Sequence, residues 1–328
     1  MDSMDVVVAA GDLWQLDLTG WSVIVDGQTT TVRLPASGVA IHVSRAEVGP
    51  PRATALQVAR SRLAVCEVPV VELLPSMAGT TWEEVEGRVV EVERWVDHDG
   101  RMNTWSRLRA GAALLARVHN AWAGLDLGTT GEACGWANWV SPDDVASGCD
   151  LAARRLASWD LGELAADVVH LAELTSGSIA LPTQVVHGDF WDNNVYVRGE
   201  QLVAVTDFDF LGRRSRIDDL ALLVYFADEQ PYFDGAGPRS AQRRRSELAP
   251  LVHDYVENLA TPLTTAEMYA LPYALARQPL WTFTKWQLTD PERDRARREA
   301  LNTAAAVSRA LEIVAEPDRW VEAFSPAV

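Results

Sequence analysis

The chain has 328 residues, 48% of them hydrophobic and 23% charged, so it can bury a substantial core and exceeds one minimal module. Its formal net charge of −17 disfavours nucleic acid or an anionic membrane as a partner, because neutralising phosphates requires a basic surface. A cationic ligand is compatible with this charge, although general solubility is the simpler explanation. The start of the chain is acidic where a secretory signal needs basic residues, and no run of about 18 apolar residues predicts a membrane span.

The cysteines bear on disulfides, zinc sites and cellular compartment, and the lysines are unusually few. Cys66, Cys134 and Cys149 are odd in number and widely spaced, which indicates neither a disulfide framework nor a zinc site. We therefore expect a cytoplasmic protein. Nearly all basic residues are arginine, and Lys285 is the only lysine.

Short β-rich runs separated by turn residues dominate the first part of the chain. The runs cover residues 21–27, 30–34, 38–44 and 87–96. Between the third and fourth runs, residues 53–65 carry apolar side chains at helical spacing. The pattern predicts a compact lobe over residues 1–96, formed by a small antiparallel sheet and one helix.

Helical periodicity dominates the remainder, which we assign to a second lobe over residues 97–328. The predicted helices include residues 108–124, 149–159, 160–174 and 292–315. Three short strands interrupt them, at residues 184–186, 195–197 and 202–205, and the last two form a hairpin through residues 198–201. Three consecutive arginines, Arg243, Arg244 and Arg245, are expected on a solvated helix face or loop.

Polar residues flank the predicted hairpin on both sides. Asp189 and Asn194 lie in the loop before it, and Asp207 follows its second strand. Transfer of a γ-phosphoryl group requires a carboxylate that orients the attacking hydroxyl and accepts its proton, together with oxygen ligands for Mg²⁺. Asp189 suits the first task, whereas Asn194 and Asp207 suit the second.

The order His187-Gly188-Asp189, Asn194, hairpin, Asp207-Phe208-Asp209 resembles the signatures of the aminoglycoside phosphotransferase and choline kinase-like family. Residues 110–119 resemble the family's preceding helix, and residues 218–221 resemble its D-L-A segment. The likeness covers roughly residues 23–227. It implies an α+β, two-lobed, protein-kinase-like fold with a small antiparallel β N-lobe and a mostly helical C-lobe.

The resemblance also implies roles for individual residues. Asp189 is the catalytic base or hydroxyl-orienting residue, Asn194 is a metal ligand, and Asp207 is the main metal ligand bridging the ATP phosphates. His187 holds the loop by hydrogen bonds. Asn193 is an adjacent competitor, but the five-residue spacing favours Asn194.

Two further acidic residues, Asp192 and Asp209, either face the substrate or make local turn hydrogen bonds. The residues alone also permit a divalent-metal hydrolase built on His187, Asp189, Asp207 and Asp209. The kinase-like order of the elements disfavours this alternative.

The nucleotide side departs from the kinase pattern. Protein kinases carry a V-A-I-K element whose lysine pairs with the α/β-phosphates and with a glutamate on the next helix. The corresponding residues 39–42 end in His42, and Gln57 is a candidate to stand opposite it. Either His42 contacts phosphate, or Arg45 or Arg33 does so, or the position has lost its role and His42 only packs in the sheet.

Two other nucleotide contacts are expected. The loop between the first two strands has only Gly27 where a glycine-rich loop has several glycines, yet its backbone amides can still bind phosphate. The strand ending near Val96 matches the hinge between lobes, where Glu93 to Trp95 are candidates to meet the base through backbone atoms.

These observations favour a Mg²⁺-dependent O-phosphotransferase that uses ATP or GTP and acts on a small molecule, with an antibiotic-like or other natural product as the expected acceptor. Choline, homoserine or sugar kinase activity remains an alternative, as does a nucleotide-binding pseudokinase with a regulatory role, because His42 replaces the lysine. Specificity for the acceptor is expected from acidic and aromatic residues of the C-lobe, namely Asp228, Glu229, Tyr232, Trp281 and Trp286.

Overall fold

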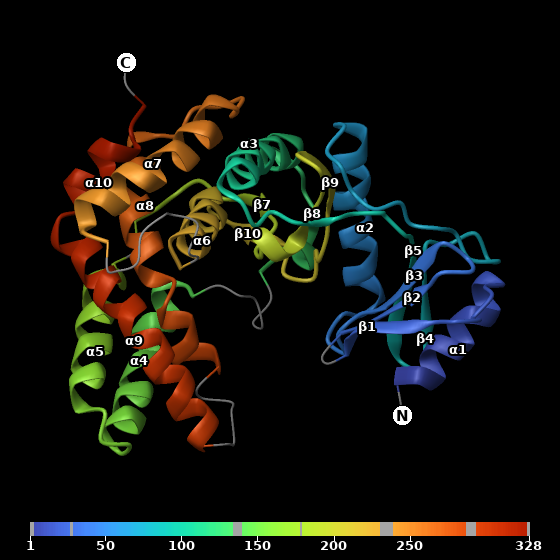
Figure 1. Ribbon diagram of the computed structural model, residues 1–328, viewed down its shortest axis with the longest axis horizontal. Coiled ribbons are helices and arrows are strands. Elements are labelled where there is room, and N and C mark those ends of the chain that lie inside the picture. The colour runs from blue at the N-terminus through green and yellow to red at the C-terminus, as the bar shows by residue number, and fades with distance from the viewer. Residues whose placement is uncertain are drawn as a thin grey trace.

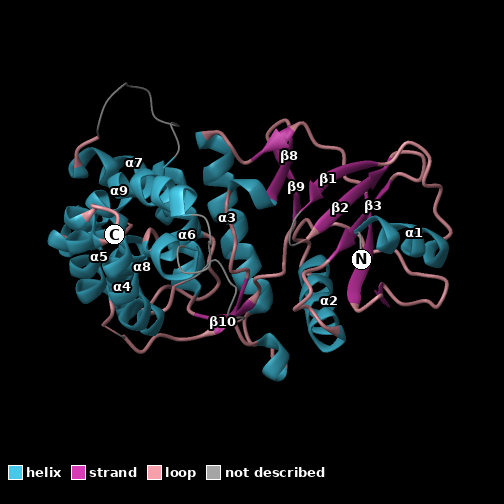
Figure 2. Cartoon of the chain, turned by 90° about the horizontal axis from the view of Figure 1, so that it is seen from below, coloured by secondary structure: helices cyan, strands magenta, loops and turns pink. Residues whose placement is uncertain are grey.

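The computed structural model describes residues 3–26, 29–133, 140–177, 179–229, 239–286 and 293–326. A smaller, β-rich lobe contains the N-terminus and a larger, helical lobe contains the C-terminus, so the two termini lie at opposite ends of the molecule (Figures 1 and 2). The predicted α+β arrangement of two lobes is confirmed.

A five-stranded antiparallel sheet forms the N-lobe, with strand order β1-β2-β3-β5-β4. Its elements are α1 (Ser3–Trp14), β1 (Ser22–Asp26), β2 (Thr30–Leu34), β3 (Val39–Val43), α2 (Pro50–Val65), β4 (Trp82–Val85) and β5 (Arg88–Arg94). The four predicted strands and the predicted helix are confirmed, whereas α1 and β4 were not predicted. In α1 the buried Val6, Val7, Ala10 and Trp14 follow helical spacing, but a run of β-branched valines obscures the period.

The two faces of this sheet differ in character. Val32, Ile41 and Val92 pair across three adjacent strands, are fully buried and belong to the apolar cluster that α1 covers. Because side chains alternate along a strand, the residues between them point to the opposite face. That face carries Thr31, Arg33, Ala40, His42, Glu91 and Glu93. A polar face of the sheet is therefore turned toward α2 and the C-lobe.

Helices and short strands alternate in the C-lobe. Its elements are β6 (Gly100–Arg101), α3 (Trp105–Trp122), α4 (Pro142–Ala157), α5 (Gly162–Thr175), β7 (Gln184–Val186), β8 (Val195–Arg198), β9 (Gln201–Val205), β10 (Gly212–Arg214), α6 (Arg216–Glu229), α7 (Ala241–Glu257), α8 (Thr265–Arg277), α9 (Arg293–Ala315) and α10 (Pro317–Phe324). Strands β8 and β9 form the predicted hairpin, and β7 pairs with β10. The hairpin thus separates two loops, which the β7–β10 pair brings back together.

Apolar packing crosses the predicted boundary between residues 96 and 97. The larger core cluster joins Leu56, Ala59 and Leu63 of α2 to the C-lobe, where the Trp122 indole N–H donates to the Ala59 carbonyl oxygen at 2.9 Å. Helix α2 therefore packs with both lobes, as its central position in Figure 1 shows. The division at residue 96 stays a prediction.

No helix within the described ranges is long and apolar enough to cross a membrane. Cys149 is buried and Cys66 partly buried, and both are free thiols, whereas Cys134 lies outside the described residues.

Candidate active site

The loop after β7 brings Asp189 and Asn194 into direct contact. The Asn194 side-chain amide donates from Nδ2 to the Asp189 carbonyl oxygen and to Asp189 Oδ2, both at 2.8 Å. Both residues are buried, whereas the adjacent Asn193 is exposed. Asn194, rather than Asn193, is therefore the asparagine that contacts Asp189.

Asp219, in the first turns of α6, anchors this loop from behind. Its carboxylate accepts hydrogen bonds from the backbone N–H groups of His187 (2.8 Å) and Gly188 (2.7 Å). It also contacts Nε2 of His119 on α3 at 3.2 Å, and His119 is held in turn by Tyr255. Burial acts to raise the pKa of Asp219, but the hydrogen bond and charge of His119 outweigh it and hold the pKa below its usual value. The sequence resemblance marked His119 and Asp219 but not this role.

Residues 187–194, between β7 and β8, form the loop that we call the catalytic loop. His187 fastens this loop to the segment that leads to Asp207. Its Nδ1 accepts the Asp189 N–H at 3.3 Å, and its Nε2–H donates to the Thr206 carbonyl oxygen at 3.0 Å. Complete burial lowers the pKa of His187 to about 4, so the ring is neutral near pH 7. These bonds agree with the predicted loop-holding role.

Gly188 is required by both conformation and space. Its φ of +81° is one that side chains with a Cβ rarely adopt. A Cβ at this position would collide with the Phe210 carbonyl oxygen and the Arg214 guanidinium. The two loops can therefore approach only if residue 188 is glycine.

Asp207 lies at the start of the second loop in a strained conformation, with φ of +60°. The residue as a whole is exposed, yet removal of its carboxyl group from water and then the nearby charge of Asp209 raise its pKa to about 6. His42 and Arg45 are close enough to act in the opposite direction. The protein thus concentrates negative charge here and faces it with two basic side chains of the N-lobe.

A divalent cation fits this arrangement. Two neighbouring carboxylates repel each other, and a bound cation relieves the repulsion. The Thr206 N–H donates to the Asn194 carbonyl oxygen at 2.9 Å, which places Asn194 beside the start of the second loop. Among the described residues no group of three or more His, Cys, Asp or Glu side chains forms a metal site. One carboxamide and one or two carboxylates, with phosphate and water completing the shell, is the kind of set that Mg²⁺ accepts.

His42 and Arg45 face these carboxylates from the N-lobe. His42 is half-buried, pairs with Glu91 in the sheet, and its Nδ1 hydrogen-bonds to the Thr31 hydroxyl at 3.2 Å. Arg45 lies 4.6 Å above the Phe210 ring, with Nε 3.9 Å from Asp209 Oδ2. Thr31, rather than Gln57, is the hydrogen-bond partner that the structure gives to His42.

Sequence reasoning missed the ion pairs that replace lysine and glutamate in this lobe. Arg60, one turn beyond Gln57 on α2, donates from Nη1 to Glu91 Oε2 at 2.8 Å and from Nη2 to Glu93 Oε1 at 2.7 Å. Arg60 and Glu91 are both buried. The available signal was an arginine at an otherwise apolar position of an amphipathic helix, opposite a strand with two alternating glutamates.

Arg52, near the start of α2, reaches the second loop. It donates to the carbonyl oxygens of Thr130 (2.6 Å), Asp209 (3.2 Å) and Leu211. The helix is thus fixed at one end to the loop that carries Asp207, and two turns later to the sheet.

The predicted hinge contacts are only partly available. The Trp95 N–H donates to the Gly38 carbonyl oxygen at 3.0 Å, and the Glu93 carboxylate is engaged by Arg60. Arg33 lies 4.3 Å above the Trp95 ring. Contacts of the base at Glu93 to Trp95 stay a prediction, and Gly27 lies outside the described residues.

Most residues expected to recognise the acceptor form ion pairs or pack in the core instead. Asp228 is buried and paired with Arg244 and Arg239, each at 2.6 Å, and Glu229 pairs with Arg309. Trp281 packs against the larger core. Tyr232 and the side chain of Trp286 lie outside the described residues.

Of the three consecutive arginines expected on a solvated face, Arg243 is exposed on α7, but the prediction is wrong for the other two. Arg244 and Arg245 are buried rather than solvated, because α7 packs them against the carboxylates of Asp228, Glu312 and Glu316. Within the loop of residues 187–194, Trp191 stacks on Phe226 of α6 with ring centroids 4.2 Å apart.

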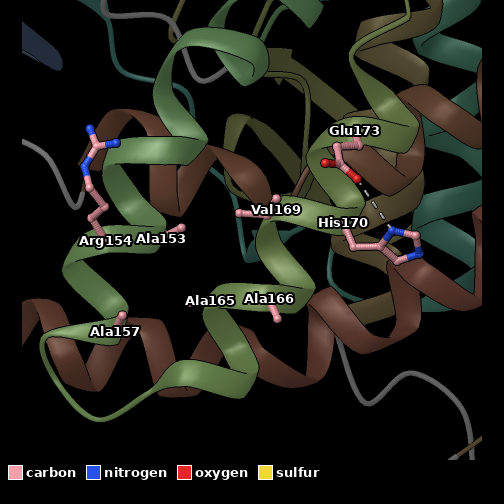
Figure 3. Close-up of a pocket in the computed structure, with 8 residues that line it drawn as sticks. All are labelled: Ala153, Arg154, Ala157, Ala165, Ala166, Val169, His170 and Glu173. Atoms are coloured by element: carbon pink, nitrogen blue, oxygen red, sulfur yellow. Dashed lines mark ion pairs between the residues drawn. The ribbon is translucent and has the colours of Figure 1, made fainter.

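Two pockets of about 500 Å³ lie in the C-lobe, away from the carboxylates. Figure 3 shows the first, between α4 and α5, where four alanines form the floor and His170 pairs with Glu173 at 4.0 Å. The second lies between α5, β10 and α8 and includes the Arg277–Asp218 ion pair. Neither is lined by Asp189, Asn194 or Asp207, so we assign neither a role in phosphoryl transfer.

Comparisons with solved structures show a shared fold. The structure of amicoumacin kinase hAmiN in complex with AMP-PNP, Ca²⁺ and Ami superimposes with a TM-score of 0.71 at 14% identity, over 96% of this chain and 94% of that chain. Spectinomycin phosphotransferase in complex with ADP and spectinomycin gives 0.64 at 11% identity, over 94% and 98%. A microcompartment-associated aminopropanol kinase gives 0.63 at 15% identity, over 98% of each chain. The kinase-like, two-lobed fold is thereby confirmed.

Family assignment rests on the sequence. No curated protein matches the chain. Residues 21–251, more than half of the chain, match the model of the phosphotransferase enzyme family, abbreviated APH. The matched range includes the catalytic loop, the second loop and the N-lobe sheet that faces them. The chain therefore belongs to the phosphotransferase enzyme family.

Proposed function

We propose that this phosphotransferase moves the γ-phosphoryl group of ATP or GTP to a hydroxyl of a small molecule in the cytoplasm, with Mg²⁺ bound by Asn194 and Asp207. The observation that carries the proposal is the joining of Asp189 to Asn194 by a hydrogen bond, on a loop that His187 and Asp219 lock beside Asp207. Locked geometry is what phosphoryl transfer requires, since positioning and charge stabilisation supply most of its catalysis.

In the proposed reaction the acceptor hydroxyl donates a hydrogen bond to the Asp189 carboxylate, which orients its oxygen toward the γ-phosphorus. The new O–P bond forms as the bond between the γ-phosphorus and the β,γ-bridging oxygen breaks, and the nucleoside diphosphate leaves with that electron pair. The hydroxyl proton passes to Asp189. Asn194 and Asp207 would hold Mg²⁺, which would supply charge neutralisation for the donor phosphates.

His42 and Arg45 are the proposed partners of the donor phosphates. Both lie on the N-lobe near Asp207, and Arg45 also lies near Asp209. An arginine forks well to phosphate oxygens, and a histidine can donate to them. This pair would do the work of the missing lysine, which argues against a pseudokinase.

The acceptor is proposed to be an antibiotic-like or other natural product. Structures that share the fold include amicoumacin kinase and spectinomycin phosphotransferase, which supports this class. The aminopropanol kinase keeps a simple amino alcohol as an alternative, alongside choline, homoserine or sugar acceptors.

A transfer assay tests the proposal. The purified protein is incubated with Mg²⁺ and labelled ATP or GTP against a panel of amicoumacin, spectinomycin, gentamicin and aminopropanol, and labelled product is measured. Transfer to any of these acceptors supports the proposal. Absence of both transfer and nucleotide hydrolysis, with either donor, refutes catalysis and leaves the pseudokinase.

A further inference from the structure

The charges that join α2 to the sheet are reversed relative to the kinase pattern. In that pattern a lysine on the third strand pairs with a glutamate on the following helix. Here the helix supplies the cation, Arg60, and the sheet supplies the anions, Glu91 and Glu93. The anions lie on β5, so the third strand is left out of the pair. His42, which replaces the lysine, only neighbours Glu91 across the ladder.

These two carboxylates engage both terminal nitrogens of Arg60. Its Nη1 and Nη2 each hold one of them, at 2.8 and 2.7 Å, and only 6% of the residue is exposed. Burial raises the pKa of Glu91, and the nearby charge of Arg60 opposes the rise. A guanidinium so engaged is not available to phosphate, so Arg60 cannot take over that task of the lysine.

The Arg60 guanidinium also lies near the second loop, residues 206–211, which is called the metal loop below because it carries Asp207. Its Cζ lies 5.5 Å from the ring centroid of Phe208, the residue between Asp207 and Asp209. Phe208 contacts the His187 ring at 5.1 Å and the Trp122 ring at 6.2 Å. A continuous set of contacts thus runs from β5 through Arg60 and Phe208 to the catalytic loop.

Arg52 adds a second connection on the same side of α2. The eight-residue separation of Arg52 and Arg60 is close to two turns, so both project from one face of the helix. Arg52 binds the backbone on the far side of Asp207, at Asp209 and Leu211. The metal loop is therefore held by α2 both at Phe208 and beyond it.

We propose that Arg60 is a positioning residue that couples the N-lobe sheet to the metal loop, so that Asp207 is presented to the Mg²⁺-nucleotide complex only while Arg60 bridges Glu91 and Glu93. The inference rests on the proposed function and deepens it. Two tasks that a single lysine performs in the kinase pattern are divided here. Arg60 aligns the sheet with the metal loop, and His42 with Arg45 meets the phosphates.

The test compares four proteins: wild type, Arg60→Lys, the triple variant Arg60→Met/Glu91→Gln/Glu93→Gln, and the control Arg109→Met. The triple variant removes the cation together with both of its carboxylate partners, buried Glu91 and partly buried Glu93, so no unpaired buried charge is left to unfold the protein. The control breaks an ion pair between α3 and α7, Arg109 with Asp254 at 2.6 Å, which involves no residue proposed to bind nucleotide or metal. Affinity for AMP-PNP is measured by calorimetry with Mg²⁺ and again with EDTA, and folding is followed by thermal melting.

Loss of a partner that orients a metal ligand typically costs 10- to 100-fold in metal affinity. We therefore expect the triple variant to melt near the wild-type temperature but to bind Mg·AMP-PNP about 10- to 100-fold more weakly, with little change in EDTA. Arg60→Lys, which can hold only one carboxylate, should show a smaller loss of the same kind. The control should bind like the wild type.

A merely structural role would weaken binding equally with and without Mg²⁺, and that result overturns the inference. So does a wild-type Mg·AMP-PNP affinity in the triple variant, or in Arg60→Lys if the triple variant does not fold. Failure of the wild-type protein itself to bind Mg·AMP-PNP would instead refute the proposed function, and the inference with it.

Discussion

Replacing Asp219 by asparagine removes the anchor of the catalytic loop while preserving its size. The carboxylate accepts from the N–H groups of His187 and Gly188 and contacts His119, all inside the protein. An asparagine keeps one acceptor oxygen and turns an NH₂ group toward a backbone donor. One charge-assisted hydrogen bond is lost and one buried donor is left without a partner.

A hydrogen bond to a charged group is worth about 1.5–3 kcal/mol, and an unsatisfied buried donor costs about 1–3 kcal/mol. We expect Asp219→Asn to lower the free energy of unfolding by about 3 kcal/mol, a large part of the 5–15 kcal/mol typical of a protein. Because Asp189 follows Gly188 directly, phosphoryl transfer should fall by at least about tenfold in the protein that remains folded.

Urea unfolding and steady-state kinetics measure the two effects separately. Asp218→Asn is the matched control, because the neighbouring Asp218 is also buried but pairs with Arg277 at 3.3 Å rather than with the catalytic loop. It should destabilise the protein without lowering kcat. If Asp219→Asn retains wild-type stability, or is destabilised no more than the control with unchanged kcat, Asp219 does not anchor the loop.

Four further outcomes are expected. Asp189→Ala should abolish transfer with nucleotide affinity nearly intact, whereas Asp207→Ala should also weaken Mg-nucleotide binding; equal losses of binding in calorimetry contradict the assigned roles. His42→Ala should raise the KM for nucleotide with little change in stability, and an unchanged KM would return His42 to sheet packing. Gly188→Ala should prevent correct folding of the loop, visible as a lower melting temperature without transfer, because its Cβ has no space. His187 is neutral when folded, with a pKa of about 4, and takes up a proton near pH 6.5 when unfolded, so stability should fall by up to about 3 kcal/mol as pH drops from 6.5 to 4. The pH dependence of urea unfolding should be flatter in His187→Gln, and identical slopes would contradict this.

The burial of charged side chains in the C-lobe could not be predicted from the sequence. From the sequence we expected Asp228 to face the acceptor and Arg244 to face solvent, because the sequence does not show that α6 and α7 pack together. Their ion pair at 2.6 Å neutralises both inside the protein. A negative net charge is therefore not evidence that these particular acids meet a cationic acceptor.

The N-lobe makes the same point about small elements. Strand β4 is only four residues long, too short for its alternation to stand out, and it forms by adding to the edge of β5. Helix α1 is identified by the buried sheet face that it covers rather than by its valine-rich sequence.

The sequence by itself determined the two-lobed fold, the family and the two loops that carry the proposed catalytic residues. Asp189, Asn194 and Asp207 are separated by one short hairpin, so local strand pairing brings their segments together whatever the rest of the chain does. Only the tertiary structure decided what supports them. Asp219 lies 30 residues beyond Asp189, and Arg60 lies 31 residues before Glu91. Contacts at such separations depend on helix packing and burial. Packing places Asp219 against the catalytic loop, and it places Arg60 between β5 and Phe208 of the second loop.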